Sequence, residues 1–352
     1  MIKKSFQKVL FAIVLLFATV FTVNAANKPT ETKTNSIPIA MATDNNYVHP
    51  TVVAMTSILE SRKADTFIDF NIMTSGKVST ENKTKLKKFE KVYNNCSVKL
   101  IDMNKEFDDT YIVPSHITTA TYYRLALPSL LSQYDKILYL DVDLVVRKDL
   151  WDMFSTDLED NYIGGVLDPY VIPVGEKSGK YSEKNYSKKL GTDGLKSYVN
   201  AGILLMNLKK LREDNMEKVF YDFIPELKKR ELLYNDQDLL NATCAGKIKI
   251  LPKEYNVFPG KFVTNPHSKY DCADPAIVHY AGSSKPWRTK SCRAWSTWDK
   301  YNKIAAEKIE KKENKKQAAK PTKRKIKPQQ KDKKRTANNK TKNKRQLRIK
   351  KH

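Results

Sequence analysis

Two carboxylates spaced two residues apart, Asp141 and Asp143, follow the apolar run at residues 137–140 of this 352-residue chain. Side chains two apart at the end of a strand point to the same side, so the two carboxylates can share one divalent cation. Unpaired carboxylates are costly in an apolar setting, so either a cation binds here or the pair faces solvent. A metal ion at this position suits one chemistry, in which it bridges a diphosphate and neutralises the charge of a departing group. The Asp-x-Asp pattern alone is equally typical of a solvated turn.

A second segment offers complementary groups, because the apolar pair Ile277-Val278 leads to His279, then Gly282, then Lys285. Glycine allows the backbone to approach a ligand closely, and lysine supplies positive charge, so this order suits a diphosphate and its metal. A neutral imidazole as third ligand favours Mn²⁺ over Mg²⁺, which prefers oxygen more strictly. The competing interpretation is a strand and tight turn with a hydrogen-bonded core histidine.

Apolar runs and helical spacing predict the elements that must position these residues. Strands are expected at residues 37–42, 67–73, 97–101, 136–140, 164–167 and 200–208. Helices are expected at residues 51–62, 79–93, 118–131 and 213–233, the last of them broken or kinked near Pro225. Strands alternating with helices favour an α/β domain with a mixed, mostly parallel sheet of Rossmann type, whose ligands gather beyond the carboxyl ends of the strands. Asp44, Asp141 and Asp168 all follow predicted strands. Residues 169–198 are too long for an ordinary connection, so they form either a disordered insertion or a substrate-facing loop.

Six ordered segments resemble a known family, the retaining glycosyltransferases of family eight, which includes bacterial lipopolysaccharide galactosyl- and glucosyltransferases and glycogenin. The matching segments lie within residues 37–295 and span residues 42–47, 116–124, 139–146, 200–208, 235–241 and 279–287. The resemblance implies a single GT-A-like nucleotide-sugar-binding domain that transfers a hexose, galactose or glucose, from a UDP-sugar to a glycan or lipopolysaccharide-type acceptor. We therefore assign residues 37–297 to the catalytic domain.

The resemblance also implies the site residues. Asp141, Asp143 and His279 would be the ligands of Mn²⁺, with Mg²⁺ as the second choice. The donor would contact Ala42, Thr43, Asp44, Asn46, Tyr47, Arg124, Asp141, Val142, Asp143, Asp168, Asn200, Gly282 and Lys285.

The resemblance implies that Asp168, Asn200, Asp236 and Gln237 surround the sugar, and the candidate catalytic residues are Gln237, Asp236 and Asp238. Glutamine is a poor nucleophile, so retention proceeds by front-side attack if Gln237 occupies the face where a double displacement needs a carboxylate. Asp236 and Asp238 are the carboxylates that could stabilise an oxocarbenium-like centre, and the sequence does not choose between the two mechanisms.

The ends of the chain differ from this domain in composition. Lys3, Lys4 and Lys8 precede an apolar run at residues 9–23 that ends near Ala25, which predicts a signal peptide (residues 1–25) followed by a polar linker at 26–36. The run is shorter than the roughly 20 residues that span a bilayer. The protein is therefore expected to be exported, or to be held at the cytoplasmic membrane face if the leader is retained as a short anchor.

The net charge of +25 is concentrated at the C-terminus, because residues 311–352 hold 20 basic and 2 acidic side chains. That segment carries +18 and the remaining chain +7. Residues 298–352 are predicted to form a Lys/Arg-rich tail that passes from helix to disorder. A block of like charge is typical of a solvated extension that needs no partner, which is the first interpretation of residues 311–352. Contact with an anionic membrane is the second, and nucleic-acid binding is the third, because no aromatic residues lie between the charges.

Two questions remain open at this level. The four cysteines either form disulfides after export, with Cys272 and Cys292 as the first pair to test, or stay as buried free thiols. The alternative to an enzyme is a domain of the same kind that has lost turnover, binds nucleotide sugar, and presents its basic tail to membranes or nucleic acid.

Overall fold

The structure is a computed structural model that describes residues 35–104, 119–171 and 182–310. The predicted signal peptide, almost all of the 26–36 linker and the basic segment 311–352 lie outside the described residues, as do residues 116–118 of the second matching segment. All of the described residues belong to one compact unit of the chain, whose boundary falls after Lys312.

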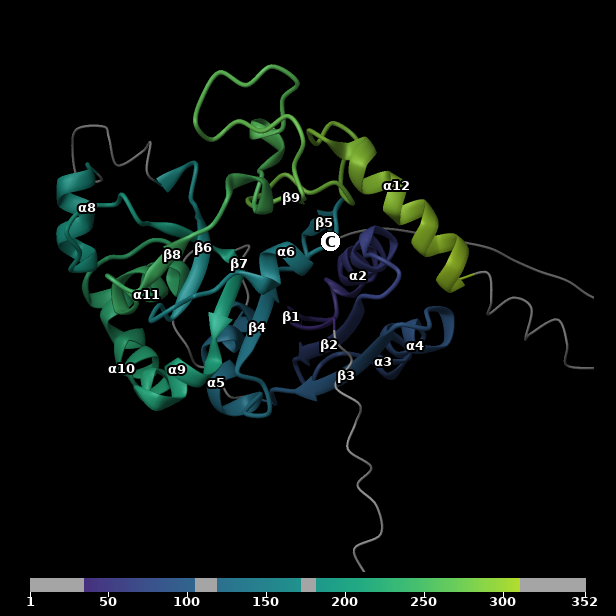
Figure 1. Ribbon diagram of the computed structural model, residues 1–352, viewed down its shortest axis with the longest axis horizontal. Coiled ribbons are helices and arrows are strands. Elements are labelled where there is room, and N and C mark those ends of the chain that lie inside the picture. Colours follow the sequence, from purple (N-terminus) through teal and green to yellow (C-terminus); the bar gives the residue numbers. More distant parts are fainter. Residues whose placement is uncertain (1–34, 105–118, 172–181, 311–352) are drawn as a thin grey trace, which may run out of the picture. The chain divides into compact units, whose positions relative to one another are not determined.

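A seven-stranded sheet forms the centre of the fold, with strand order β3-β2-β1-β4-β7-β6-β8 (Figure 1). The strands are β1 (Ser36–Thr43), β2 (Phe67–Thr74), β3 (Cys96–Asp102), β4 (Lys136–Leu140), β6 (Ile163–Leu167), β7 (Val199–Asn207) and β8 (Ile248–Ile250). The pairs β1–β2, β2–β3, β1–β4 and β6–β8 are parallel, whereas β7 is antiparallel to both β4 and β6. The prediction of a mixed, mostly parallel sheet is confirmed.

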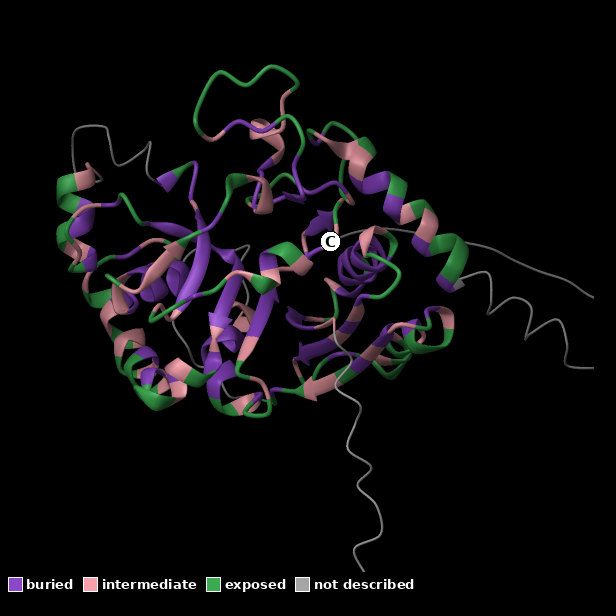
Figure 2. Cartoon of the chain, in the orientation of Figure 1, coloured by how far each residue is buried: buried purple, intermediate pink, exposed green. Residues whose placement is uncertain are grey.

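Alternate residues along the central strands enter two separate hydrophobic cores, because successive side chains of a strand point to opposite faces. Leu138 of β4 packs in one core and Ile137 in the other, and Leu205 and Leu204 of β7 divide in the same way. One face is covered by α2 (Val48–Ser61), α3 (Thr80–Lys87), α4 (Phe89–Val92) and α6 (Trp151–Ser155). The other face is covered by η1 (Thr119–Ala126), α5 (Leu127–Leu130), α8 (Glu183–Leu190), α9 (Leu208–Glu213), α10 (Met216–Lys229) and α11 (Asn235–Thr243). The central strands of the sheet are therefore buried on both sides, and Figure 2 shows β4, β6 and β7 almost entirely in the colour of buried residues.

Two helices expected as continuous are divided in the structure. The first, at residues 79–93, begins with the Ser79 side chain capping the N–H of Asn82 and breaks between α3 and α4 at Lys88. The second, expected at residues 118–131, is a 3₁₀ helix (η1) followed by one α-helical turn (α5) that has Pro128 in its first turn. Proline is suited to that position because it has no N–H to donate.

The folded unit extends past the expected domain end at residue 297. Helix α12 (Trp295–Ala305) and the π-helical turn η4 (Ala306–Glu310) bury Trp298, Tyr301 and Ile309. Figure 1 shows α12 running beside α2, and Tyr301 is hydrogen-bonded to Ser61 of α2 at 3.2 Å. Residues 298–310 are thus part of the packed domain, and the predicted tail is corrected to begin after them.

The long segment at residues 169–198 is partly ordered as a helix, since α8 lies within it, capped by Ser182 and ended by Gly191 in the left-handed conformation. Residues 172–181 lie outside the described part. All four cysteines are buried and free, so the structure adopts the free-thiol alternative and the Cys272–Cys292 disulfide is not formed. Within the described ranges, no helix has the length and hydropathy needed to cross a bilayer.

Candidate active site

Polar residues that follow several different strands meet at one edge of the sheet. Asp44, Asp141 and Asp168 come after β1, β4 and β6, whose carboxyl ends share that edge. Because β7 runs in the opposite direction, its first residues, including Asn200, lie at the same edge. A cavity of about 370 Å³ opens there. Its wall is formed by Ala42, Asp44, Tyr47, Ala120, Thr121, Arg124, Tyr139, Asp141, Val142, Asp143, Asp168, Tyr170, Val171, Asn200, Ala201, Gly202, Tyr234, Asp236, Gln237, Phe258, His279, Ala281, Gly282 and Lys285.

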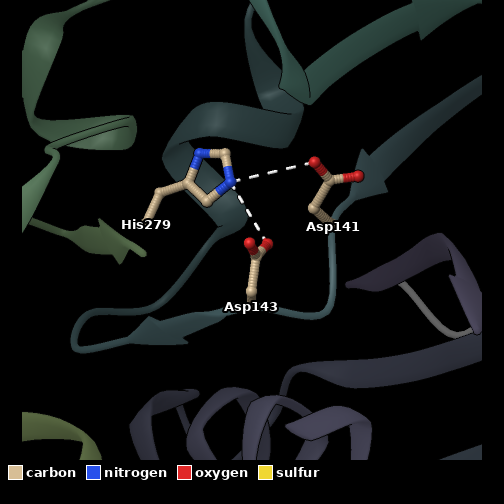
Figure 3. A group of neighbouring side chains, drawn as sticks. All are labelled: Asp141, Asp143 and His279. Carbon is tan, nitrogen blue, oxygen red and sulfur yellow. Dashed lines mark ion pairs between the residues drawn. The ribbon is translucent and has the colours of Figure 1, made fainter. Parts of the chain in front are cut away.

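Asp141, Asp143 and His279 form one cluster in the cavity wall, with one ligand atom of each lying within 4.8 Å of the others. The Nε2 atom of His279 is 3.8 Å from Oδ2 of Asp141 and 3.3 Å from Oδ1 of Asp143. Figure 3 shows both carboxylates facing that same ring nitrogen. Two carboxylates and an imidazole that converge in this way are a ligand set for a divalent cation.

A second, two-stranded sheet brings the distant histidine to the aspartates. Strand β5 (Leu144–Val146) pairs antiparallel with β9 (Ile277–His279), and Leu144 lies opposite His279. The N–H of Tyr280 donates to the carbonyl of Asp143 at 2.8 Å, and the N–H of Asp141 donates to the carbonyl of Gly202 at 2.7 Å. Backbone pairing thus fixes the chain on both sides of the Asp-x-Asp segment.

Gly202 of β7 leaves the space in which the three side chains meet. A Cβ atom at this position would lie 2.6 Å from Oδ2 of Asp141 and 2.4 Å from Cε1 of His279. Both distances are shorter than normal contacts, so any side chain would displace a ligand. The residues present therefore fit a bound cation, both in the chemistry of the donor set and in the room that Gly202 provides.

A chain of buried amides orients His279. Its Nδ1 atom lies 3.0 Å from Oδ1 of Asn256, and the amide of Asn256 donates to Oδ1 of Asn200 at 2.9 Å. Asn200 in turn donates to Oε1 of Gln237 at 2.9 Å and to Oδ2 of Asp168 at 3.1 Å. Such partners fix the orientation of a metal-binding imidazole, so the histidine and the glutamine belong to one hydrogen-bonded network.

Arg124 joins two carboxylates at the base of the cavity, with its guanidinium 3.0 Å from Asp141 and 3.1 Å from Asp236. It is only 3% exposed and also donates to the backbone carbonyls of Thr121 and Ala201. Burial raises the pKa of Asp236 to about 6, although Arg124 and Thr121 oppose the change. Arg124 thus balances the negative charge of the aspartates.

Lys285 forms an ion pair with Asp143 and donates to the carbonyl of Tyr280 at 2.9 Å. Burial alone would raise the pKa of Asp143, but the positive charge of Lys285 and the hydrogen bonds with His279 and Lys285 lower it below its ordinary value. Burial alone would lower the pKa of Lys285, and the contact with Asp143 more than compensates, so that its pKa is raised. Both groups are therefore charged at neutral pH.

Tyr47 lines the cavity near Lys285 and packs edge-on against Trp287, with ring centroids 5.6 Å apart. Asp44 lies beside it, and one of its carboxylate oxygens accepts hydrogen bonds from the N–H groups of Asn46 and Tyr47 at 2.8 and 3.1 Å. This turn leaves the aromatic ring and one carboxylate oxygen of the pair available to a ligand.

Three of the predicted site residues do not line the cavity. Thr43 is buried at the end of β1, and Asn46 is exposed. Asp238 is fully buried and accepts hydrogen bonds from the hydroxyls of Tyr186 and Tyr198, both at 2.6 Å, and from two backbone N–H groups that precede α11. The Asp238 carboxylate therefore anchors the start of α11 to Tyr186 and to Tyr198, which precedes β7. Gln237 and Asp236, in contrast, line the cavity.

Several residues of the site have no signal of their own in the sequence. Asn256 lies in an irregular segment with no motif, and its role depends on a histidine that follows it by 23 residues. Tyr170 and Phe258 form part of the wall and are paired at a centroid distance of 5.3 Å. Gly202 lies within a matched segment, but only the fold shows that it faces the metal ligands.

Known proteins to which this chain is similar include the following three. A putative glycosyltransferase from Haemophilus influenzae is 30% identical over 257 residues, which are 72% of this chain and 73% of that protein. Lipopolysaccharide 1,2-glucosyltransferase from Escherichia coli is 28% identical over 265 residues, covering 71% and 72% of the two chains. The crystal structure of the galactosyltransferase LgtC in complex with donor and acceptor sugar analogues is 30% identical, with a TM-score of 0.65, and the match covers 77% of this chain and 96% of LgtC.

The sheet, the cavity at its edge and the cluster of two aspartates and a histidine define a glycosyltransferase domain of the GT-A type. The family model for glycosyl transferase family 8 matches residues 38–291. This chain belongs to glycosyl transferase family 8, as its sequence motifs indicate.

Proposed function

We propose that the protein transfers a hexose, galactose or glucose, from a UDP-sugar to a glycan or lipopolysaccharide-type acceptor with retention of configuration, assisted by Mn²⁺. The observation that carries this proposal is the meeting of Asp141, Asp143 and His279 in the same cavity as Asp168 and Gln237. Family membership supports glycosyl transfer, and relatives with galactosyl- and glucosyltransferase names support a hexose.

Asp141, Asp143 and His279 would hold the cation, which when bound neutralises the charge that develops on a departing diphosphate. Lys285 adds a compact positive charge beside Asp143, so it is placed to bind a phosphate oxygen. Tyr47 offers a ring on which the uracil base can stack, and the free oxygen of Asp44 can accept its imide N–H.

Gln237 and Asp236 lie on the sugar side of the proposed site. The carbonyl oxygen of Gln237 already accepts hydrogen bonds from Asn200 and from the backbone N–H of Ala201, at 2.9 and 3.0 Å. Asp236 is held by Arg124 and Thr121. An immobilised amide and an arginine-paired carboxylate favour front-side attack, in which the diphosphate oxygen accepts the proton of the acceptor hydroxyl.

The acceptor side and the cellular location extend the proposal. We infer export or membrane association from the leader, and contact with anionic lipid from residues 311–352, both of which rest on the sequence. Such a location would place the enzyme near lipid-linked or cell-surface glycans.

A donor screen tests the proposal. Purified full-length protein is incubated with a panel of UDP-sugars and sugar acceptors, and UDP release is measured with and without Mn²⁺. We expect release from UDP-galactose or UDP-glucose only with Mn²⁺, and a loss of at least about 100-fold in Asp143→Asn, because removal of one ligand weakens the cation site. The matched control is Asp274→Asn, an exposed aspartate paired with Lys148. No release from any donor, with Mn²⁺ binding intact, would reject the proposal.

A further inference from the structure

One positively charged side chain near the cavity, that of Arg293, has no role in the proposed mechanism. Arg293 is exposed, and among the described residues no carboxylate forms an ion pair with its guanidinium. It belongs to the segment 259–294, which holds six basic and two acidic residues and also supplies His279, Gly282 and Lys285. Lys261 and Lys285 of this segment are paired with Asp271 and Asp143, whereas the charge of Arg293 is not neutralised by a carboxylate of the described residues.

The position of Arg293 relative to the cavity follows from Gly260. An added Cβ at Gly260 would lie 3.3 Å from the hydroxyl of Tyr170 and 3.6 Å from Nη1 of Arg293. The two polar groups thus converge on the space that the missing side chain leaves open. Tyr170 is 50% exposed and lines the cavity, so this notch adjoins the cavity mouth.

A continuous set of contacts connects the notch to the metal cluster. The ring of Phe258 lies edge-on to His279 at 5.4 Å and packs against Tyr170 at 5.3 Å. The N–H of Tyr170 donates to Asp168 at 2.8 Å, and Asp168 also contacts Asn200 and Gln237. Tyr170 consequently stands between the proposed sugar site and Arg293.

These contacts separate Arg293 from the groups assigned to the donor diphosphate. Lys285 is 6% exposed and paired with Asp143, whereas Arg293 is exposed and lies beyond Phe258 and Tyr170. A guanidinium with a fixed fork of donors recognises carboxylate or phosphate oxygens, and a nearby tyrosine hydroxyl adds a further donor.

We infer that the acceptor is an anionic glycan, whose carboxylate or phosphate group is bound by Arg293 and the Tyr170 hydroxyl over Gly260. The inference rests on the proposed function, and it makes Arg293 a specificity residue and not a catalytic one. The attacked hydroxyl lies at the Asp168 and Gln237 side of Tyr170, and the charged group lies on the far side.

The test compares three small acceptors with the full-length protein: methyl glucoside, methyl glucuronoside and methyl glucoside 6-phosphate. Acceptor-dependent UDP release is measured with Mn²⁺ and the active donor. We expect kcat/KM for at least one charged acceptor to exceed that for methyl glucoside by about tenfold or more. A ratio of this size corresponds to the free energy of one charge-assisted hydrogen bond. The better of the two charged compounds identifies carboxylate or phosphate as the recognised group.

Arg293→Gln should abolish that preference by raising KM for the charged acceptor, while methyl glucoside turnover and acceptor-independent donor hydrolysis change less than about twofold. Gly260→Val should have the same effect by filling the notch, with the arginine retained. Lys290→Gln is the matched control, because this exposed lysine lies over the ring of Trp295. Equal kcat/KM for all three acceptors, or an equal loss for charged and neutral ones in Arg293→Gln, overturns the inference.

Failure of the proposed function gives a different result, namely no UDP release from any donor. In that case saturation-transfer NMR measures whether the protein binds each of the same three glycosides, and this binding tests the inference. Binding of a charged glycoside that is lost in Arg293→Gln supports the inference, and absence of binding to the parent protein overturns it.

Discussion

At the scale of single residues, the site places three negative charges close together and compensates them with two buried cations. Arg124 pairs with Asp141 and Asp236, and Lys285 pairs with Asp143. Buried charges of one sign are expensive unless each has a partner, and here each carboxylate has a cationic one. The arrangement is nevertheless unequal, because burial raises the pKa of Asp236 while the pKa of Asp143 is lowered.

Asp236 gives a prediction for stability against pH. Its pKa is about 6 in the folded protein, against 3.8 for an ordinary aspartate, so the folded state takes up a proton first as the pH falls. Above pH 6 the buried Asp236 is charged and destabilises the folded state by the full desolvation cost. Protonation of the carboxylate removes this cost as the pH falls towards 4. The free energy of unfolding of the parent protein, relative to Asp236→Asn, should therefore rise by on the order of 3 kcal/mol between pH 7 and pH 4. Urea unfolding of the two metal-free proteins across this pH range measures the difference in their free energies of unfolding. The same pH dependence in the parent protein and in Asp236→Asn would contradict the prediction.

At the scale of elements, the strands before the site could be predicted, but the pairing that completes it could not. The apolar runs at residues 37–42 and 136–140 correspond to β1 and β4, and their carboxyl ends do carry Asp44 and Asp141. The reversed direction of β7 has no local signal, since an apolar strand pairs in either direction. Asn200 nevertheless reaches the cavity because of that reversal.

The local helix patterns show the same limit. Apolar spacing predicted one helix at residues 118–131, but the chain forms η1 and α5 there, and Arg124 of η1 points to Asp141. Arg124 contacts two aspartates that are distant in the sequence, and the spacing of apolar residues carries no information about such tertiary contacts. Composition likewise places Trp298 and Tyr301 in the helical start of the Lys/Arg-rich tail, yet one face of that helix, α12, packs against α2.

Gly202 gives a prediction that concerns strand β7 as an element. Gly202→Ala should leave the sheet folded but displace Asp141 or His279, since the new Cβ would lie 2.4 Å from the imidazole. We expect Mn²⁺ affinity to fall by roughly 10–100-fold, the range found when groups around a metal site are altered. Isothermal titration with Mn²⁺ measures the affinity, and thermal unfolding in EDTA checks the fold. Gly76→Ala is the control, because its added Cβ would meet nothing closer than 3.6 Å. Unchanged affinity in Gly202→Ala would show that the cation binds elsewhere.

At the scale of the whole molecule, the chain divides into a packed unit that ends near residue 312 and a basic segment after it. The segment at residues 311–352 carries +18 of the net charge of +25. Catalysis and membrane contact, as proposed above, would therefore reside in separate parts of the chain. Deletions that respect this boundary should separate the two properties, whereas deletions that cross it should not.

Deletion of residues 311–352 tests this separation. We expect binding to vesicles that contain phosphatidylserine to weaken strongly, because each Lys or Arg near an anionic surface contributes about 1 kcal/mol. UDP release with a soluble acceptor and the thermal unfolding temperature should stay unchanged. Deletion from residue 295 is the contrast, since it also removes Trp298, Tyr301 and Ile309 from the core and should destabilise or unfold the protein. If the shorter deletion binds vesicles as well as the full chain does at 50 mM salt, where surface charge acts most strongly, the membrane contact lies in another part of the molecule.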